Sequence, residues 1–98
     1  MLLKIHRTPM GEVTAICDSE LIGTVLSEGA FVLDLERHAI FYSGKKVSES
    51  AAIDALSGAE NVNLVGKRAL AAAKKAGVDT SGAIFIKSVP HLQIYRLP

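Results

Sequence analysis

Hydrophobic and polar residues alternate along several short segments of the chain, which is the pattern of half-buried β-strands. The first two segments are 2–8 and 12–18, and the Pro-Met-Gly sequence at 9–11 separates them. Proline and glycine at these positions favour a tight turn, so we expect a β-hairpin. Alternation in the second strand predicts one shared face for Val13, Ala15 and Cys17.

The alternation returns after a segment whose structure the pattern leaves open. Residues 18–29 contain Asp18 and Ser19, which can cap a helical turn, but also two interrupting glycines. Residues 30–36 form a strand pattern with Phe31, Leu33 and Leu35 on one side. We expect 39–43 to be a strand that pairs with 30–36 in a second hairpin.

Two segments have the composition of helices. Residues 48–58 begin at a capping serine, Ser48, and end at a glycine. Residues 63–77 are rich in alanine, and we expect this helix to begin at Asn63 and end at Gly77. At 100° per residue its alanines face the sheet, and its solvent side carries Lys67, Arg68, Lys74 and Lys75.

Two further strands, 83–89 and 91–97, are predicted to end the chain, with Pro90 between them. Proline lacks the backbone N–H of a sheet ladder, so we expect an edge, a bulge or a sharp bend. The predicted order is β-β-β-β-α-α-β-β. It indicates a single α+β domain over 1–98, with a mostly antiparallel sheet of about five to six strands and two helices packed on one face.

Composition excludes several classes of protein. Cys17 is the single cysteine of the 98 residues, so an intramolecular disulfide and a thiolate zinc site are both excluded, and we expect neither a metal nor a cofactor. No segment approaches the roughly 20 apolar residues of a membrane helix. We therefore expect a cytoplasmic protein that does not interact with a membrane.

The net charge of +1 conceals an asymmetry along the chain. Residues 1–44 contain three basic and six acidic side chains, whereas 45–98 contain eight basic and four acidic ones. A protein of this kind can present a basic surface without being basic overall. The competing interpretation is a chance drift of charge in a short chain.

The last strand contains the first candidate site. Period-two alternation places His91, Gln93 and Tyr95 on one face, about 7 Å apart along the strand. Histidine and glutamine both donate and accept hydrogen bonds, so this row is suited to a base edge, a peptide or a phosphate. The competing interpretation is a solvated outer face.

The second candidate is the start of the alanine-rich helix. A helix N-terminus presents unpaired N–H groups, Gly66 would allow a ligand to approach, and Lys67 and Arg68 would add positive charge. We include Asn63, the expected cap, in this anion site. The segment is not a P-loop, and a capped helix with solvated lysines remains the competing interpretation.

A third hypothesis is a small enzyme that uses Cys17 or His91. A thiol nucleophile needs a nearby base, and nothing in the sequence brings the two together. Cys17 shares its predicted face with Val13 and Ala15, as a buried structural cysteine would. His6 and His38 show no metal-ligand spacing with His91.

Four short strings resemble an archaeal conserved family catalogued as domain of unknown function 424. The likeness covers nearly the whole chain, and Ser88 stands where the family pattern would have glycine. It implies an archaeal cytosolic protein with a housekeeping role. The strings are Cys17-Asp18-x-Glu20-Leu21-x-Gly23, Phe41-Tyr42-x-Gly44, Asn63-Leu64-Val65-Gly66 and Val89-Pro90-His91-x-Gln93.

These observations favour a non-catalytic binding module for RNA or a ribonucleoprotein, with base stacking on an exposed Phe41 or Tyr42. The alternative is a protein-interaction module, such as a homodimer that pairs exposed strand edges at 2–8 or 91–97. The residues expected to bind a ligand are Asn63, Gly66, Lys67, Arg68, His91, Gln93 and Tyr42.

Overall fold

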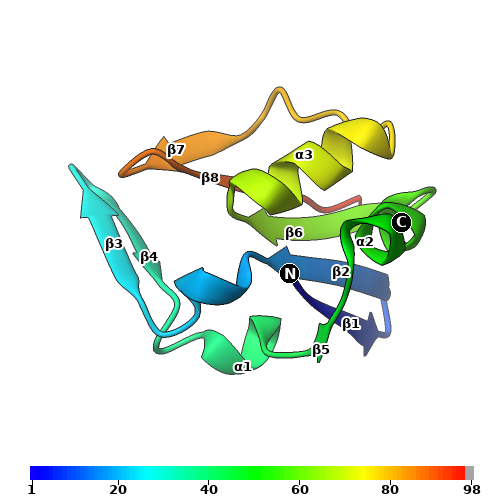
Figure 1. Cartoon of the computed structure of the whole chain (residues 1–98), viewed down its shortest axis with the longest axis horizontal. Coiled ribbons are helices and arrows are strands. Elements are labelled where there is room, and N and C mark those ends of the chain that lie inside the picture. Colours follow the sequence, from blue (N-terminus) through cyan, green and yellow to red (C-terminus); the bar gives the residue numbers. More distant parts are fainter. Residues whose placement is uncertain (97–98) are drawn as a thin grey trace.

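The computed structural model describes residues 1–96 and has the α+β architecture that the sequence predicts (Figure 1). Its main sheet has six strands in the order β5-β1-β2-β6-β8-β7, and β3 and β4 form a separate hairpin. The strands are β1 (Leu2–Thr8), β2 (Gly11–Cys17), β3 (Val25–Glu28), β4 (Phe31–Asp34), β5 (Lys45–Lys46), β6 (Asn61–Val65), β7 (Ile84–Ile86) and β8 (Val89–Ile94). The helices are α1 (Ala39–Tyr42), α2 (Glu49–Leu56) and α3 (Lys67–Lys75), with a 3₁₀ turn, η1, at Ser19–Leu21.

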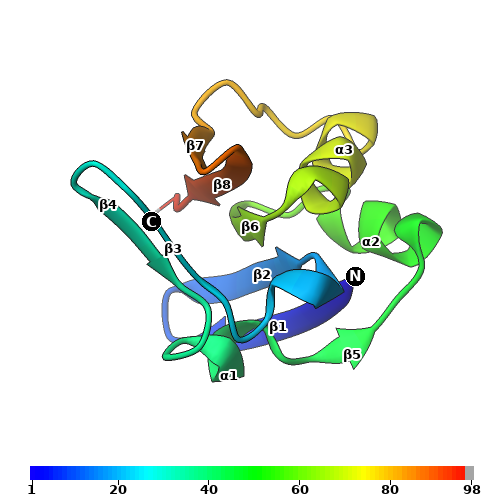
Figure 2. The ribbon, with the colours of Figure 1, turned by 60° about the vertical axis from the view of Figure 1, so that its left-hand side comes forward.

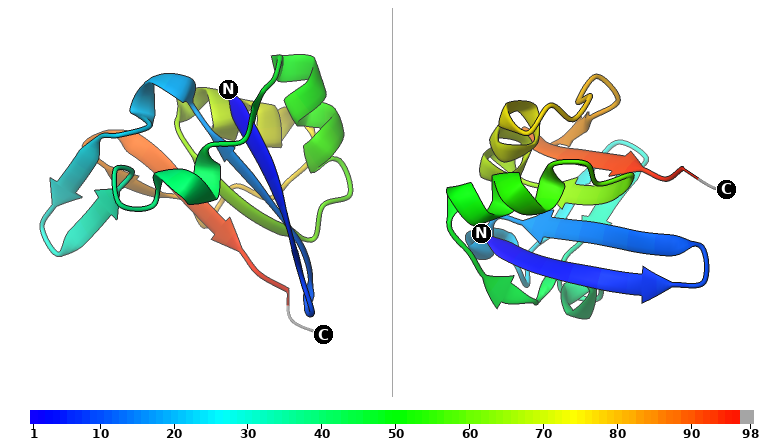
Figure 3. Two further views of the ribbon diagram at one scale, coloured as in Figure 1. Left: turned by 90° about the horizontal axis from the view of Figure 1, so that it is seen from below. Right: turned by 90° about the vertical axis from the view of Figure 1, so that its right-hand side faces the viewer.

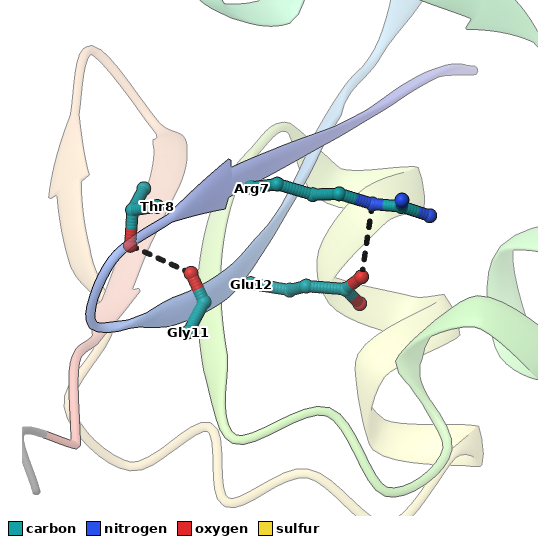
Figure 4. Close-up of polar contacts among 4 residues, drawn as sticks. All are labelled: Arg7, Thr8, Gly11 and Glu12. Atoms are coloured by element: carbon teal, nitrogen blue, oxygen red, sulfur yellow. Dashed lines mark hydrogen bonds and ion pairs between the residues drawn. The ribbon is translucent and has the colours of Figure 1, made fainter.

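The first hairpin is confirmed. Strands β1 and β2 pair antiparallel from Leu2 opposite Cys17 to Thr8 opposite Gly11. The Thr8 hydroxyl donates to the Gly11 carbonyl at 2.6 Å and closes the turn (Figure 4). An exposed ion pair between Arg7 and Glu12, 3.3 Å apart, lies beside it. The turn therefore closes through local contacts, as its sequence indicates.

The main sheet is mostly antiparallel, as expected, but it is mixed. Within residues 1–96 four of its five strand pairings are antiparallel, and β2 pairs with β6 in parallel. A parallel neighbour requires a crossover, and α2 lies within the segment that makes it. Every residue of β6 is buried, as is typical of a parallel strand covered on both faces.

The two faces of the sheet are covered differently. Helices α2 and α3 pack on one face, where Ile16, Leu64 and Leu92 meet a cluster rich in alanine. On the other face Ala15, Cys17 and Val65 pack against Leu33 and Leu35 of the β4 segment and Tyr42 of α1. Figures 2 and 3 show the β3–β4 hairpin on the far side of the molecule from α2. The prediction of two helices on one face is confirmed.

The expected second hairpin, between 30–36 and 39–43, is wrong in its second strand. Residues 39–42 are helical, and β4 pairs instead with β3, a strand from the segment whose structure the sequence left open. The Asp34 carboxylate accepts hydrogen bonds from the N–H groups of Glu36 and Arg37, at 3.1 and 2.8 Å, and turns the chain out of the strand. Phe31 is 56 % exposed, so the burial of Leu33 and Leu35 does not extend to it, although strand alternation places it on the same side as Leu33.

The predicted helix over 63–77 is also wrong at its beginning. Asn63 lies in β6, and α3 begins after Gly66, which has a φ of 115°. The Asp18 carboxylate, at the end of β2, accepts hydrogen bonds from the N–H groups of Arg68 and Ala69 at 3.0 and 2.9 Å. This cap comes from a residue far away in the sequence, so local reasoning assigned the role to Asn63 instead.

Pro90 lies inside the sheet, not at an edge or a bend. It is buried in β8 between β6 and β7, and its carbonyl accepts from the Gly66 N–H at 2.9 Å. In an antiparallel ladder the N–H and C=O of one residue point to the same neighbour. The Gly66 carbonyl is already engaged by the N–H of Leu70 in α3. The Gly66 carbonyl, opposite Pro90, therefore needs no N–H from position 90, and a proline is tolerated there.

A tight turn joins β7 to β8. Lys87 and Ser88 both have positive φ, 51° and 65°, as a type I′ hairpin turn requires. The sequence resemblance led us to expect glycine where Ser88 stands, and glycine adopts this left-handed conformation with the least strain. The Lys87 N–H donates to a Glu28 carboxylate oxygen at 2.9 Å, so the tip of the β3–β4 hairpin is attached to this turn.

Two sequence expectations end at the edge of the described region. Leu97, the last residue of the expected strand 91–97, lies outside the described residues. Among residues 1–96, none of the helices has the length and apolar character needed to cross a membrane.

Replacement of Gly66 by alanine tests the junction between α3 and Asp18. A Cβ atom there would lie 2.2 Å from Asp18 Cγ, in addition to the strain of a positive φ. We expect Gly66→Ala to lower the free energy of unfolding by about 3 kcal/mol in urea titrations. Gly77→Ala is the matched control, because Gly77 has a φ of 85° but no neighbour near its Cβ. Gly77→Ala should lower the free energy of unfolding by about 1 kcal/mol. Equal losses in the two variants would show that the close approach of Asp18 to Gly66 does not contribute.

Candidate functional site

A pocket of about 570 Å³ opens on the sheet face opposite α2 and α3. Its floor consists of side chains from β6 and the β8 segment: Asn63, His91, Gln93 and Tyr95. Its wall is formed by residues 32–35 and 37–38, around the end of β4, and by residues 41–42 of α1. The pocket has the size of a small-molecule site.

The buried amide of Asn63 connects the floor of the pocket to its wall. The Tyr42 hydroxyl donates to Asn63 Oδ1 at 2.5 Å, and His91 Nε2 lies 3.1 Å from the same oxygen. Asn63 Nδ2 donates to the Tyr95 hydroxyl at 2.9 Å. Asn63 is only 7 % exposed, so this amide is a fixed part of the protein interior. It joins α1, β6 and the β8 segment in one hydrogen-bond network.

Burial sets the protonation of the network. It lowers the pKa of His91, because the charged imidazolium is poorly solvated there. It also raises the pKa of the Tyr42 hydroxyl, an effect that exceeds the opposing hydrogen bond to Asn63. Both side chains are therefore neutral near pH 7. The bottom of the pocket presents neutral donors and acceptors rather than fixed charge.

Two side chains of β1 hold α1 against the sheet. Lys4 Nζ donates to the Ile40 carbonyl at 2.8 Å, and His6 Nε2 lies 2.8 Å from the Phe41 carbonyl. The rings of His6 and Phe41 stack with their centroids 4.2 Å apart. Gly44 follows directly, where a Cβ atom would lie 2.0 Å from the Leu3 carbonyl oxygen. The wall of the pocket is thus positioned from a strand that contributes no lining residue.

Four of the seven expected ligand residues line this pocket: Tyr42, Asn63, His91 and Gln93. Period-two alternation correctly placed the side chains of the last strand on one face. Asn63, which we expected as a helix cap, reaches the pocket as a strand residue. Tyr42, expected to be exposed for stacking, is instead 4 % exposed and contributes its hydroxyl to the network.

The other three expected residues, Gly66, Lys67 and Arg68, lie elsewhere. They line a separate hollow of about 270 Å³ together with two acidic side chains, Asp18 and Glu20. The backbone N–H groups of Arg68 and Ala69 already donate to Asp18. A carboxylate of the protein itself therefore occupies the place where we expected an external anion.

The polar part of the pocket wall was not predicted from the sequence. Arg37 and His38 line the pocket from the loop between β4 and α1, which the sequence suggested was a simple hairpin turn. Asp34, beside them, is engaged with backbone N–H groups. The available signal was a short polar run, Glu36-Arg37-His38, between two apolar segments.

Cys17 has the environment of a structural thiol. It is completely buried, its Sγ donates to the Asp18 carbonyl at 3.3 Å, and burial raises its pKa to about 12. A thiol with such a pKa carries almost no thiolate at neutral pH, so it is a poor nucleophile. Among residues 1–96, no three histidine, cysteine or acidic side chains are grouped as a metal site would require.

The fold and the pocket define a class: a small α+β protein with a mixed sheet, two helices on one face and a polar pocket on the other. The chain belongs to the family described as "Protein of unknown function (DUF424)", whose model matches residues 5–97. The resemblance inferred from the four strings is therefore confirmed. Three of those strings supply Tyr42, Asn63 and His91 to the network, and two supply Asp18 and Gly66 to the start of α3.

A solved structure has the same fold. It is described as an uncharacterized conserved protein from Methanopyrus kandleri, and it matches with a TM-score of 0.79 and 32 % sequence identity. The match covers 99 % of this chain and 91 % of that one. Comparison with curated proteins gives no match.

Alkylation of Cys17 tests its assignment as a structural thiol. At pH 8, a rise in pKa from 9.0 to about 12 lowers the thiolate fraction about 10³-fold. We expect iodoacetamide to label the native protein at least that much more slowly than the same chain in urea. Comparable rates in the two states would instead indicate an exposed, activated thiol.

The depressed pKa of His91 predicts a pH-dependent stability. Below about pH 6.5 the unfolded imidazole binds a proton that the folded one still excludes. The folded protein therefore has its full stability above the pKa of the unfolded imidazole. It loses stability as the pH falls from that pKa through the lower pKa of the folded imidazole. We expect urea titrations between pH 7 and 5 to show a steeper loss of stability in the wild type than in His91→Gln. Parallel curves would show that His91 titrates alike in both states.

Proposed function

We propose that this protein is a non-catalytic RNA-binding module whose pocket holds one unpaired base of a single strand. The observation that carries the proposal is the Tyr42–Asn63–His91–Tyr95 network at the bottom of a pocket of about 570 Å³. Proteins read single-stranded RNA by stacking extruded bases on aromatic or guanidinium planes and by hydrogen-bonding to their edges.

The pocket has both kinds of group. Phe41, Tyr95 and His38 supply rings in its lining, and Gln93, which is exposed, supplies an amide that both donates and accepts. Arg37 is exposed at the wall and, among residues 1–96, forms no ion pair, so its guanidinium is free to meet a phosphate or to stack on a base. These groups support a site for a nucleotide unit.

The proposal places RNA on the pocket face instead of on α3. The basic residues of α3, Lys67, Arg68, Lys74 and Lys75, are exposed as expected. The buried side of the same helix packs on the sheet face opposite the pocket. One short strand of RNA in the pocket would not need these cations. They contribute at most a long-range electrostatic attraction that salt screens.

The homodimer alternative stays a prediction. Strand β8 pairs with β7 through Val89–His91 and with β6 through His91–Ile94, so each of its edges is partly covered. Strand β1 pairs with β5 through Leu2 and Leu3 alone on its outer side. The expected edges at 2–8 and 91–97 are therefore shorter than the sequence suggested.

Fluorescence anisotropy with short labelled RNA homopolymers at low salt tests the proposal. We expect at least one single strand to bind, and the matching duplex to bind more weakly. Gln93→Ala and Arg37→Ala change exposed side chains and should each weaken binding about 5- to 150-fold, since a stacked or paired base contributes roughly 1–3 kcal/mol. The control, Lys67→Ala with Lys74→Ala, should change affinity less than threefold.

Two outcomes would overturn the proposal. One is the absence of binding to every homopolymer at low salt. The other is the reverse pattern of variants, in which the α3 double variant abolishes binding and the two pocket variants have no effect. The reverse pattern would move the binding surface to the opposite face of the sheet.

A further inference from the structure

The hydrogen-bond network around Asn63 has a fixed direction. An amide oxygen only accepts, so the hydrogen between Asn63 Oδ1 and His91 must belong to Nε2. The same Asn63 oxygen accepts from the Tyr42 hydroxyl through its second lone pair. The amide nitrogen of Asn63 faces the other way and donates to Tyr95. One buried side chain therefore sets the hydrogen-bonding state of three neighbours.

This direction determines what the pocket offers a ligand. A neutral imidazole has one N–H, so a hydrogen on Nε2 leaves Nδ1 of His91 as an acceptor. Among residues 1–96, His91 Nδ1 has no hydrogen-bond partner. It is also not a fully buried atom, because Ser19 Oγ is the one side-chain nitrogen or oxygen of these residues that is both fully buried and without a partner. The Tyr95 oxygen already accepts from Asn63, so its own hydrogen is free to be donated.

We propose that Asn63 acts as a specificity-determining residue, which makes the pocket select a planar group that carries an N–H donor beside a hydrogen-bond acceptor. The N–H would be donated to His91 Nδ1, and the acceptor would receive the Tyr95 hydroxyl hydrogen. This inference rests on the proposed RNA-binding function and names the chemistry of the bound base. The Watson–Crick edge of an unpaired nucleobase has this arrangement, for example N3–H beside a carbonyl in uracil.

The state of His91 can be measured without any ligand. Imidazole ¹⁵N chemical shifts of the free protein at pH 7.5 should show a protonated Nε2 and an unprotonated Nδ1. In Asn63→Leu, which removes the accepting oxygen, the spectrum should move toward a mixture of tautomers. Tyr95→Phe is the matched control, because it removes a partner of Asn63 and leaves the Oδ1–His91 contact intact. A wild-type Nδ1–H tautomer would overturn the inference.

Methylated RNA tests the selection itself. The probes are the homopolymer that the wild type binds most tightly and the same polymer with every Watson–Crick N–H replaced by N-methyl (N3-methyl in uridine, N4,N4-dimethyl in cytidine, N6,N6-dimethyl in adenosine, N1-methyl with N2,N2-dimethyl in guanosine). We expect methylation to weaken wild-type binding at least tenfold. In His91→Phe, which keeps a ring but loses the acceptor, the same comparison should differ less than twofold.

The outcomes separate the two proposals. Equal binding of methylated and unmethylated polymer to the wild type would overturn this inference and leave RNA binding in place. A lack of binding to all homopolymers would overturn the proposed function, and with it the assignment of the ligand as a base. The tautomer spectrum would then still decide the direction of the network.

Discussion

The contact between the Asp18 carboxylate and the first turn of α3 organises this fold. Asp18 follows β2, donates its own N–H to the Val65 carbonyl, and accepts from two N–H groups of α3. It thereby ties the parallel pair β2–β6 to the helix that follows β6. An aspartate cap of this kind satisfies otherwise unpaired N–H groups and has a favourable interaction with the helix dipole. The approach is possible because position 66 has no side chain.

The pocket depends on this junction through β6. The contact fixes where β6 ends and α3 begins, and so which residues of β6 face each side. With Val65 and Asn63 on the pocket side and Leu64 on the helix side, a polar amide lies at the centre of an otherwise apolar surface. A buried amide is costly unless its hydrogen bonds are satisfied. The residues that satisfy Asn63 come from α1 and the β8 segment, so the same bonds that stabilise the interior also assemble the site.

Sequence reasoning succeeded where the determining interactions are local. The Pro9–Gly11 turn, the Ser48 cap of α2 and the alanine face of α3 all depend on neighbours within a few residues. It failed where distant residues decide. Residues 39–43 have strand propensity, but Lys4 and His6 hold 39–42 as a helix against the sheet. The start of α3 could not be found locally, because its cap, Asp18, directly follows β2 and is far from α3 in the sequence.

The candidate site shows the same division. The shared face of His91 and Gln93 follows from strand periodicity alone, so it was predictable. Their convergence with Asn63 and Tyr42 required the strand order, which period and composition do not determine. Arg37 and His38 reach the pocket because Asp34 bends the chain after β4. A single sequence indicates that the chain bends there, but not that the residues after the bend line a pocket.

The bond between Glu28 and the Lys87 N–H has a mechanical consequence. The β3–β4 hairpin is attached to the body at its base, where Leu35 is completely buried against the sheet, and again at its tip. A hairpin held at both ends cannot swing, so the mouth of the pocket keeps its width while the contact between Glu28 and the Lys87 N–H is intact. The outer contact is one exposed carboxylate on a surface turn, so the position of the hairpin tip depends on a single side chain.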